Sequence, residues 1–146
     1  MYSLKFTGAF RRIIAFLIDL LIIFILTYLL SSFLKLFFLI FGGVKGTDLF
    51  EENVILIRSI IYFLISFFYF SFFISTSLSS TLGQFFLKMK VVDHEENHIT
   101  LPVSIGRYFA MYLSFLSLGL GLFMALYNPN RQTLHDKLCK TFVIDR

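Results

Sequence analysis

The chain has 146 residues, of which 58% are hydrophobic and 15% are charged, and its mean hydropathy is +0.82. This composition excludes a small soluble domain, because one small core cannot bury so much apolar surface. The formal net charge of +4 does not indicate nucleic-acid binding, since the basic residues flank apolar segments singly or in pairs and form no stripe. We therefore expect a single-domain integral membrane protein with the lipid bilayer as its partner.

The first apolar segment covers residues 13–41 and follows Arg12. Gly42 and Gly43 end it, because their backbone freedom breaks a helix. About 20 residues are enough to cross the roughly 30 Å hydrocarbon layer, so the segment can span a membrane. It is longer than the core of a signal peptide and no small-residue cleavage site follows, so we expect it to remain in the protein.

Asp19 lies inside this segment and is the strongest functional lead in the sequence. An ionised carboxylate in hydrocarbon costs about 3 kcal/mol or more, and intramembrane acids often mark ion or proton pathways. Arg12 precedes it by seven residues, but helical side chains lean toward the N-terminus, so we expect no direct pair within one helix. Two interpretations stay open: a proton or cation site, or an acid that hydrogen-bonds a neighbouring helix for about 0.6 kcal/mol.

The second apolar segment covers residues 54–80, and its second half is rich in hydroxyl side chains. If the segment runs antiparallel to the first, Ser71, Ser75 and Thr76 reach the depth of Asp19. Together with Asp19 they form the candidate proton or cation site. The alternative is that these small residues serve close helix packing.

A polar loop follows at residues 81–100. Val91 and Val92 on one side of its polar turn, and residues 99–101 on the other, suggest a small β-hairpin. A second possibility is that Val91 and Val92 pair with residues 142–144, which requires the tail to return to the same face of the membrane. The turn contains four side chains that can bind metals: His94, Glu95, Glu96 and His98. A hydrated polar turn accounts for them without a metal, so we expect no metal site there.

The third apolar segment, residues 101–127, is ambiguous. If it crosses the membrane once, the basic residues divide six against seven between the two sides; if it turns back near Gly119 and Gly121, they divide ten against three. Because Lys and Arg concentrate on the cytoplasmic side, the second division favours a re-entrant segment with both termini in the cytoplasm. The segment is too short for two full spans, which favours one crossing or two half-helices.

The tail, residues 128–146, carries a second notable acid. Thr133 and Asp136 have the spacing of a helix capping box, in which the negative charge of the acid also interacts favourably with the helix dipole. Asp136 can in addition meet Arg12 or Arg107 at the cytoplasmic rim, and both roles can hold together. Cys139 has no second thiol to pair with, so we expect it to be inert.

Three motifs in order resemble the RDD family of bacterial membrane proteins: residues 12–19, residues 81–93 and residues 130–144. The family is named for an arginine at the start of its first helix, an aspartate within that helix and a later aspartate. The resemblance places these roles at Arg12, Asp19 and Asp136. It implies a multi-pass protein of the cell membrane, and it carries a suggestion of transport, including sodium/proton exchange.

The expected fold class is therefore all-α: a small polytopic transmembrane helix bundle with a small cytoplasmic β-hairpin or tail element. The first functional hypothesis is a small transporter, or a transport component, in which Asp19 exchanges a proton for a small cation and Arg12 or Arg107 balances its charge. Because three or four short helices enclose little volume, we expect a homo-oligomer. The second hypothesis is a membrane scaffold or partner subunit whose loop and tail form a docking face. No nucleophile-base pair or phosphate loop indicates an enzyme, and we expect no cofactor.

Overall fold

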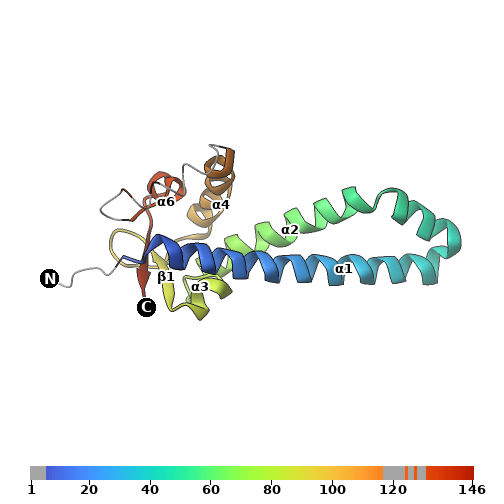
Figure 1. Ribbon diagram of the computed structural model, residues 1–146, viewed down its shortest axis with the longest axis horizontal. Coiled ribbons are helices and arrows are strands. Elements are labelled where there is room, and N and C mark those ends of the chain that lie inside the picture. Colours follow the sequence, from blue (N-terminus) through green and yellow to red (C-terminus); the bar gives the residue numbers. More distant parts are fainter. Residues whose placement is uncertain (1–5, 117–123, 125–126, 128–130) are drawn as a thin grey trace. The chain divides into compact units, whose positions relative to one another are not determined.

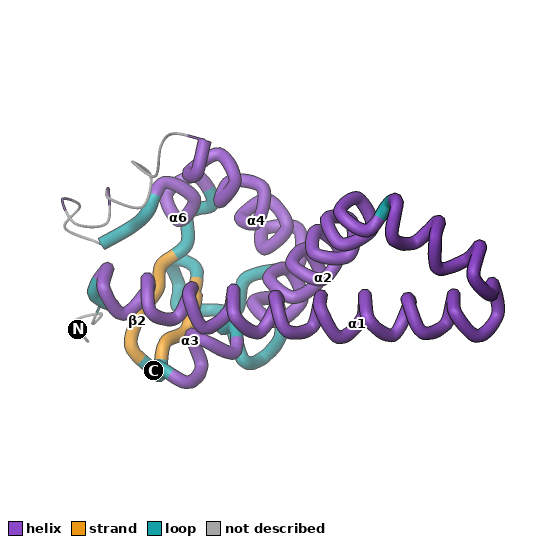
Figure 2. The backbone as a smooth tube through the Cα atoms, turned by 45° about the vertical axis from the view of Figure 1, so that its right-hand side comes forward, coloured by secondary structure: helices purple, strands orange, loops and turns teal. Residues whose placement is uncertain are grey.

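The computed structural model describes residues 6–116, 124, 127 and 131–146 (Figure 1). The chain divides into two compact units, residues Met1–Asp19 with Phe68–Arg146, here called the mixed unit, and residues Leu20–Phe67, here called the hairpin unit. The described chain is mostly helical, with a short two-stranded sheet (Figure 2). Its elements are α1 (Ala9–Glu52), α2 (Val54–Ser75), α3 (Leu82–Phe86), β1 (Met89–Val92), α4 (Leu101–Leu116), α6 (Leu134–Leu138) and β2 (Phe142–Asp145).

Two helices in the described part of the chain are long and apolar enough to cross a membrane, at Ala9–Gly43 and Val54–Ser75. Only 22% and 28% of their most apolar windows are buried. Such exposure of apolar side chains suits lipid rather than water. The first two predicted segments therefore have matching helices, and the third predicted segment contains α4, which is described from Leu101 to Leu116. A bundle of three spanning segments is not confirmed.

The hairpin unit contains a sharp break in α1 at Gly43, whose φ of 58° and ψ of −155° are not helical. The predicted end of the first segment is confirmed there. After this break α1 resumes and continues to Glu52, and α2 begins at Val54. An ion pair between Lys35 and Glu51 joins the two parts of α1. The guanidinium carbon of Arg58 lies 5.7 Å from the centre of the Tyr28 ring, which joins α2 to α1 within this unit.

The mixed unit is organised around an antiparallel pair of strands. Val91 of β1 lies opposite Val143 of β2, and Val92 lies opposite Phe142. The hairpin expected between residues 91–92 and 99–101 is wrong, because Leu101 begins α4; the alternative pairing with residues 142–144 is confirmed. Phe6 bridges to Ile144 in antiparallel fashion, so the N-terminal segment joins the same sheet.

The tail of the mixed unit returns to α4, since α6 packs against it. The turn expected near Gly119 and Gly121 lies outside the described residues. The second helix also ends earlier than predicted, at Ser75 rather than near residue 80. The chain between Thr76 and Thr81 leads instead into α3, and this shift moves Thr81 into the site described below.

Because Gly43 has a backbone conformation that is almost confined to glycine, Gly43→Ala should lower the free energy of unfolding by about 1–3 kcal/mol. Gly42→Ala is the matched control. Its added Cβ would lie 3.9 Å from the Phe38 ring, an ordinary contact, and alanine gains about 1 kcal/mol over glycine in a helix. The measurement is denaturant unfolding in mild detergent micelles. Equal effects of the two substitutions would contradict a Gly-specific break.

Candidate functional site

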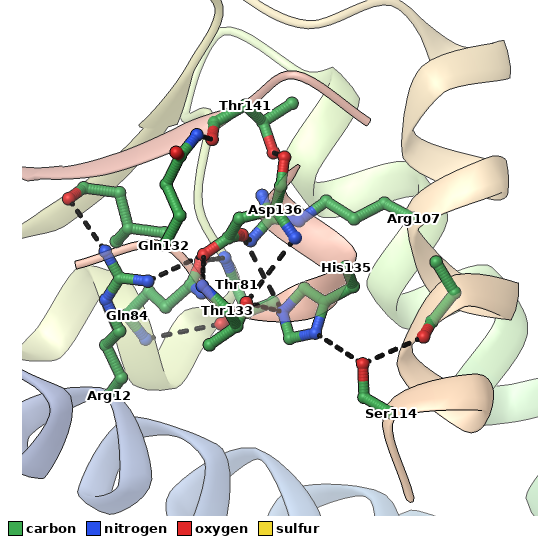
Figure 3. Close-up of polar contacts among 12 residues, drawn as sticks. Arg12, Thr81, Gln84, Arg107, Ser114, Gln132, Thr133, His135, Asp136 and Thr141 are labelled. Carbon is green, nitrogen blue, oxygen red and sulfur yellow. Dashed lines mark hydrogen bonds and ion pairs between the residues drawn. The ribbon is translucent and has the colours of Figure 1, made fainter. Parts of the chain in front are cut away.

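Asp136 is a fully buried ionisable group of the mixed unit, with no solvent exposure. Arg12 Nη1 donates to its Oδ2 at 2.6 Å, and Arg107 Nη2 donates to its Oδ1. Figure 3 shows Arg12 from α1 and Arg107 from α4 both reaching this carboxylate of α6. The predicted meeting of Asp136 with Arg12 or Arg107 is therefore confirmed, and both arginines take part.

The predicted capping box at the start of α6 is also confirmed. The Thr133 amide donates to Asp136 Oδ2 at 3.2 Å, and the Asp136 amide donates to the Thr133 hydroxyl at 3.4 Å. Burial by itself would raise the pKa of the Asp136 carboxyl, but the charges of Arg107 and Arg12 outweigh it and hold that pKa well below its ordinary value. Asp136 is therefore a carboxylate at every physiological pH.

His135 lies beside this ion-pair cluster. Its Nε2 is 3.0 Å from the Thr133 hydroxyl and its Nδ1 is 3.5 Å from the Ser114 hydroxyl. Burial lowers the pKa of His135 to about 4, and the positive charges of Arg107 and Arg12 add to this effect against the opposing pull of Asp136. The imidazole is therefore neutral at neutral pH, and the cluster of two guanidiniums and one carboxylate keeps an excess positive charge.

Asp19 forms a second buried centre, with 1% of its surface exposed. Within the described residues its carboxylate accepts three hydrogen bonds, from the Tyr69 hydroxyl at 2.6 Å, the Thr81 hydroxyl at 2.6 Å and the Gly83 amide at 2.8 Å. The Leu82 amide in turn donates to the Tyr69 oxygen at 3.2 Å. Asp19 thereby fastens α1 to α2 and to the first turn of α3.

Gly83 is required for this contact because α1 and α3 approach very closely there. A Cβ on Gly83 would overlap the carbonyl oxygen of Ala15 and would lie 2.9 Å from the Asp19 carboxyl group. Both neighbours are held in place, Ala15 by the helix backbone and Asp19 by its three donors. A side chain at position 83 would therefore push α3 away from α1.

The structure does not bring the predicted hydroxyl residues to Asp19. Ser75 donates to the carbonyl oxygen of Phe72 at 2.9 Å and Thr76 to that of Phe73 at 2.7 Å, both on their own helix. The Ser71 hydroxyl is buried with no hydrogen-bond partner among the described residues. As expected, Arg12 and Asp19 do not pair directly: Arg12 and Arg107 bind Asp136 instead.

One cavity of about 150 Å³ joins the two centres of the mixed unit. Its charged and titratable lining residues come from α1, α4 and α6, and its other walls are largely apolar. These charged and titratable lining residues are Arg12, Asp19, Arg107, His135, Asp136 and Tyr108. The three positions that the sequence singled out, Arg12, Asp19 and Asp136, thus line the same cavity.

Tyr69, Thr81 and Gly83 are the site residues that sequence reasoning missed. Thr81 and Gln84 form a capping box at α3, with Thr81 accepting from the Gln84 amide and donating its own amide to the Gln84 side chain. This Thr-x-x-Gln spacing is visible in the sequence and could have indicated a helix start at residue 82. No comparable signal points to Tyr69.

Neither thiol nor metal chemistry has support in the described geometry. Burial raises the pKa of the Cys139 thiol, which disfavours the reactive thiolate. Among the residues that the structure describes, no group of three or more His, Cys, Asp and Glu side chains is placed to hold a metal ion. The absence of a metal site, a cofactor and an enzymatic activity stays a prediction.

The chain matches a family model and is similar to two curated proteins. The model of the RDD family matches residues 6–140. The chain is 28% identical to "Uncharacterized protein YxaI" of Bacillus subtilis over 149 aligned residues, covering 96% of this chain and 97% of that protein. It is 32% identical to "Uncharacterized protein RP437" of Rickettsia prowazekii over 97 residues, covering 66% of this chain and 48% of that protein. No solved structure matches the chain.

Gly83→Ala should destabilise the protein by about 1–3 kcal/mol, because the added methyl group overlaps backbone and the Asp19 carboxylate. Gly106→Ala, in α4, is the matched control, since its Cβ would meet only the Cys139 sulfur at 4.0 Å. Thermal unfolding of both variants in the same detergent measures the difference. A Gly83 variant as stable as the Gly106 variant would show that the approach of α3 to α1 is looser than described.

Stability should fall as the pH drops from about 6.5 to about 4. In this window His135 becomes protonated in the unfolded chain but stays neutral in the folded protein. Acidification therefore lowers the free energy of unfolding by up to about 3 kcal/mol. Asp136 does not contribute to this change, because its carboxyl is ionised in both the folded and the unfolded chain through this window; its stabilising effect is lost only below the ordinary aspartate pKa of 3.8. His135→Gln should flatten the pH dependence, whereas His94→Gln, at an exposed position, should retain it. An unchanged profile in His135→Gln would assign the pH dependence to another group.

Proposed function

The chain belongs to the RDD family, and from this premise we propose that it is a small, non-enzymatic membrane transport component whose solute site is the cavity of the mixed unit. The observation that carries the proposal is the lining of that cavity by buried Asp19, Arg107 and Asp136 and by Arg12, whose side chain is 11% exposed. Ionisable residues within apolar helices are costly and commonly mark substrate or ion pathways. The two apolar helices Ala9–Gly43 and Val54–Ser75 support a location in the cell membrane.

We further propose that both termini lie on the cytoplasmic side. The Phe6–Ile144 bridge and the pairing of β1 with β2 support this orientation, because they draw the N-terminal segment, the loop after α2 and the tail into one small sheet. Segments that share a sheet lie on the same side of the bilayer. The concentration of basic residues near these segments favours the cytoplasmic face.

We also propose that Asp19 exchanges a proton for a cation. Within the described contacts, Asp19 Oδ2 accepts only the Thr81 hydroxyl, and a carboxylate oxygen can accept a second partner. Protonation of either oxygen would remove the negative charge that strengthens the hydrogen bonds from Tyr69, Thr81 and Gly83. Proton uptake at Asp19 would therefore loosen the start of α3 from α1, which gives the exchange a structural consequence.

Asp19→Asn should abolish sodium-dependent proton movement in proteoliposomes while leaving a folded protein, because asparagine cannot take up and release the proton. Asp145→Asn is the matched control. Its carboxylate pairs with Arg11 and Thr7 and does not line the cavity, so flux should persist. Flux that survives in Asp19→Asn would remove Asp19 from the mechanism. Cross-linking in the same vesicles should show a homo-oligomer, since one copy encloses only a small cavity.

A membrane scaffold or partner subunit is the second candidate. The observation that favours it is the structural use of both acids: Asp19 fastens α1 to α3, and Asp136 fastens α1 and α4 to α6. In that case the loop at residues 81–100 and the tail would form a docking face. Asp19→Asn would then reduce assembly and leave no flux to lose, and a stoichiometric partner would co-purify with the wild-type chain.

A further inference from the structure

The ion-pair cluster around Asp136 leaves two buried donors unused. Among the described residues, Arg12 Nε and Arg107 Nη1 are buried side-chain nitrogens without a hydrogen-bond partner. The Arg107 side chain is 6% exposed and the Arg12 side chain 11%. A buried guanidinium N–H without an acceptor costs more than a neutral one, so each of these positions favours an acceptor group.

The two unused donors belong to guanidinium groups that meet at one carboxylate and line one cavity. Both guanidinium groups bind the same carboxylate, Arg12 on Oδ2 and Arg107 on Oδ1 of Asp136. Both residues also line the cavity. Asp136 does not supply the missing acceptors in the described structure: it receives Arg12 Nη1, Arg107 Nη2 and the Thr133 amide, and neither unused donor bonds to it.

The charge of the cluster favours an anion over a neutral acceptor. Arg12 and Arg107 contribute two positive charges and Asp136 one negative charge. His135 adds none at neutral pH. Asp19 lies elsewhere in the cavity lining and, among the described contacts, binds three neutral donors and pairs with neither arginine, so the excess charge is that of the Asp136 cluster alone. An excess buried charge is costly in a medium of low dielectric constant, and a monoanion would cancel it.

The size and walls of the cavity limit what this anion can be. An apolar cavity of about 150 Å³ can hold a molecule the size of benzene. Phe16, Phe70, Ile74 and Met111 contribute apolar walls. The occupant that fits is an oxyanion on a small apolar body.

We propose that the cavity binds a singly charged oxyanion with a small apolar body, such as a short-chain carboxylate, through Arg12 Nε and Arg107 Nη1. This inference rests on the proposed function, since it names the solute class of the same cavity. An anionic lipid headgroup presents the same chemistry, because a phosphodiester is also a singly charged oxyanion joined to an apolar body. The two sources are separated in the test.

Thermal unfolding of the full chain in phosphatidylcholine nanodiscs tests the proposal, with sodium butyrate as the probe. At about ten times its Kd, butyrate should raise Tm by about 3 °C. Butyramide, which has the same shape without the charge, and sodium chloride at matched ionic strength should not. Replacing part of the lipid with phosphatidylglycerol separates the sources: a headgroup ligand raises Tm and removes the response to butyrate, whereas a soluble ligand leaves the response intact. A chain that responds to neither butyrate nor phosphatidylglycerol overturns the proposal and assigns the two donors to water.

Arg12→Lys sharpens the test, because lysine keeps a positive charge for Asp136 but has no Nε. It should weaken butyrate binding about tenfold, the loss expected for one charge-assisted hydrogen bond. Arg11→Lys is the matched control, since Arg11 pairs with Asp145 and does not line the cavity; its binding should equal that of the wild type. Full binding in Arg12→Lys, or the same loss in Arg11→Lys, overturns the assignment. If Arg12→Lys does not fold, Arg107→Lys is measured in its place. The comparison of butyrate with butyramide on the wild-type chain tests charge-dependent binding without either variant.

The failure of this proposal is distinguishable from the failure of the transport proposal. Butyrate binding without flux of any ion or solute in proteoliposomes would overturn transport and leave the anion site. Sodium-dependent proton movement without butyrate or lipid binding would overturn the anion site and leave transport.

Discussion

A single fully buried carboxylate holds the mixed unit together. Asp136 binds guanidinium groups from α1 and α4 and at the same time caps its own helix, α6. In a low-dielectric interior none of these charges is tolerable alone, so the three elements are placed by the requirement that the charges meet. The position of β2, which follows α6, and therefore of the sheet, depends on the same contact: Arg12 Nη2 also donates to the Val143 carbonyl oxygen at 3.2 Å.

Asp19 also joins several helices through one buried carboxylate, but its hydrogen-bond donors are neutral. Its partners are two hydroxyls and one amide, and two of the three come from the chain just after α2. Whereas Asp136 is held by full charges, Asp19 is held by hydrogen bonds that a proton or a cation could replace. The two acids therefore differ in chemistry: Asp136 is ion-paired to two guanidinium groups, and Asp19 is hydrogen-bonded to neutral groups.

The excess positive charge near Asp136 and the separate carboxylate of Asp19 line one cavity. An anion at the unused guanidinium donors and a cation or proton at Asp19 would each complete a local charge balance. This arrangement connects the proposed solute class with the proposed exchange, because both use groups that the fold has already buried. The scaffold alternative uses the same contacts without any occupant.

The sequence by itself determined the membrane class, the first two apolar helices, the break at Gly43 and the cap of α6. These features depend on local properties, namely composition, hydrophobic length, glycine conformational freedom and the spacing of Thr133 from Asp136. It also identified Arg12, Asp19 and Arg107, which stand within or next to long apolar runs, and Asp136, through its capping-box spacing and the family resemblance. Only the tertiary structure decided how these charges combine. The pairing of residues far apart in the chain follows from where α3, α4 and α6 pack, so Asp19 receives Tyr69, Thr81 and Gly83 instead of the expected Ser71, Ser75 and Thr76. No local pattern records which helix face will meet another.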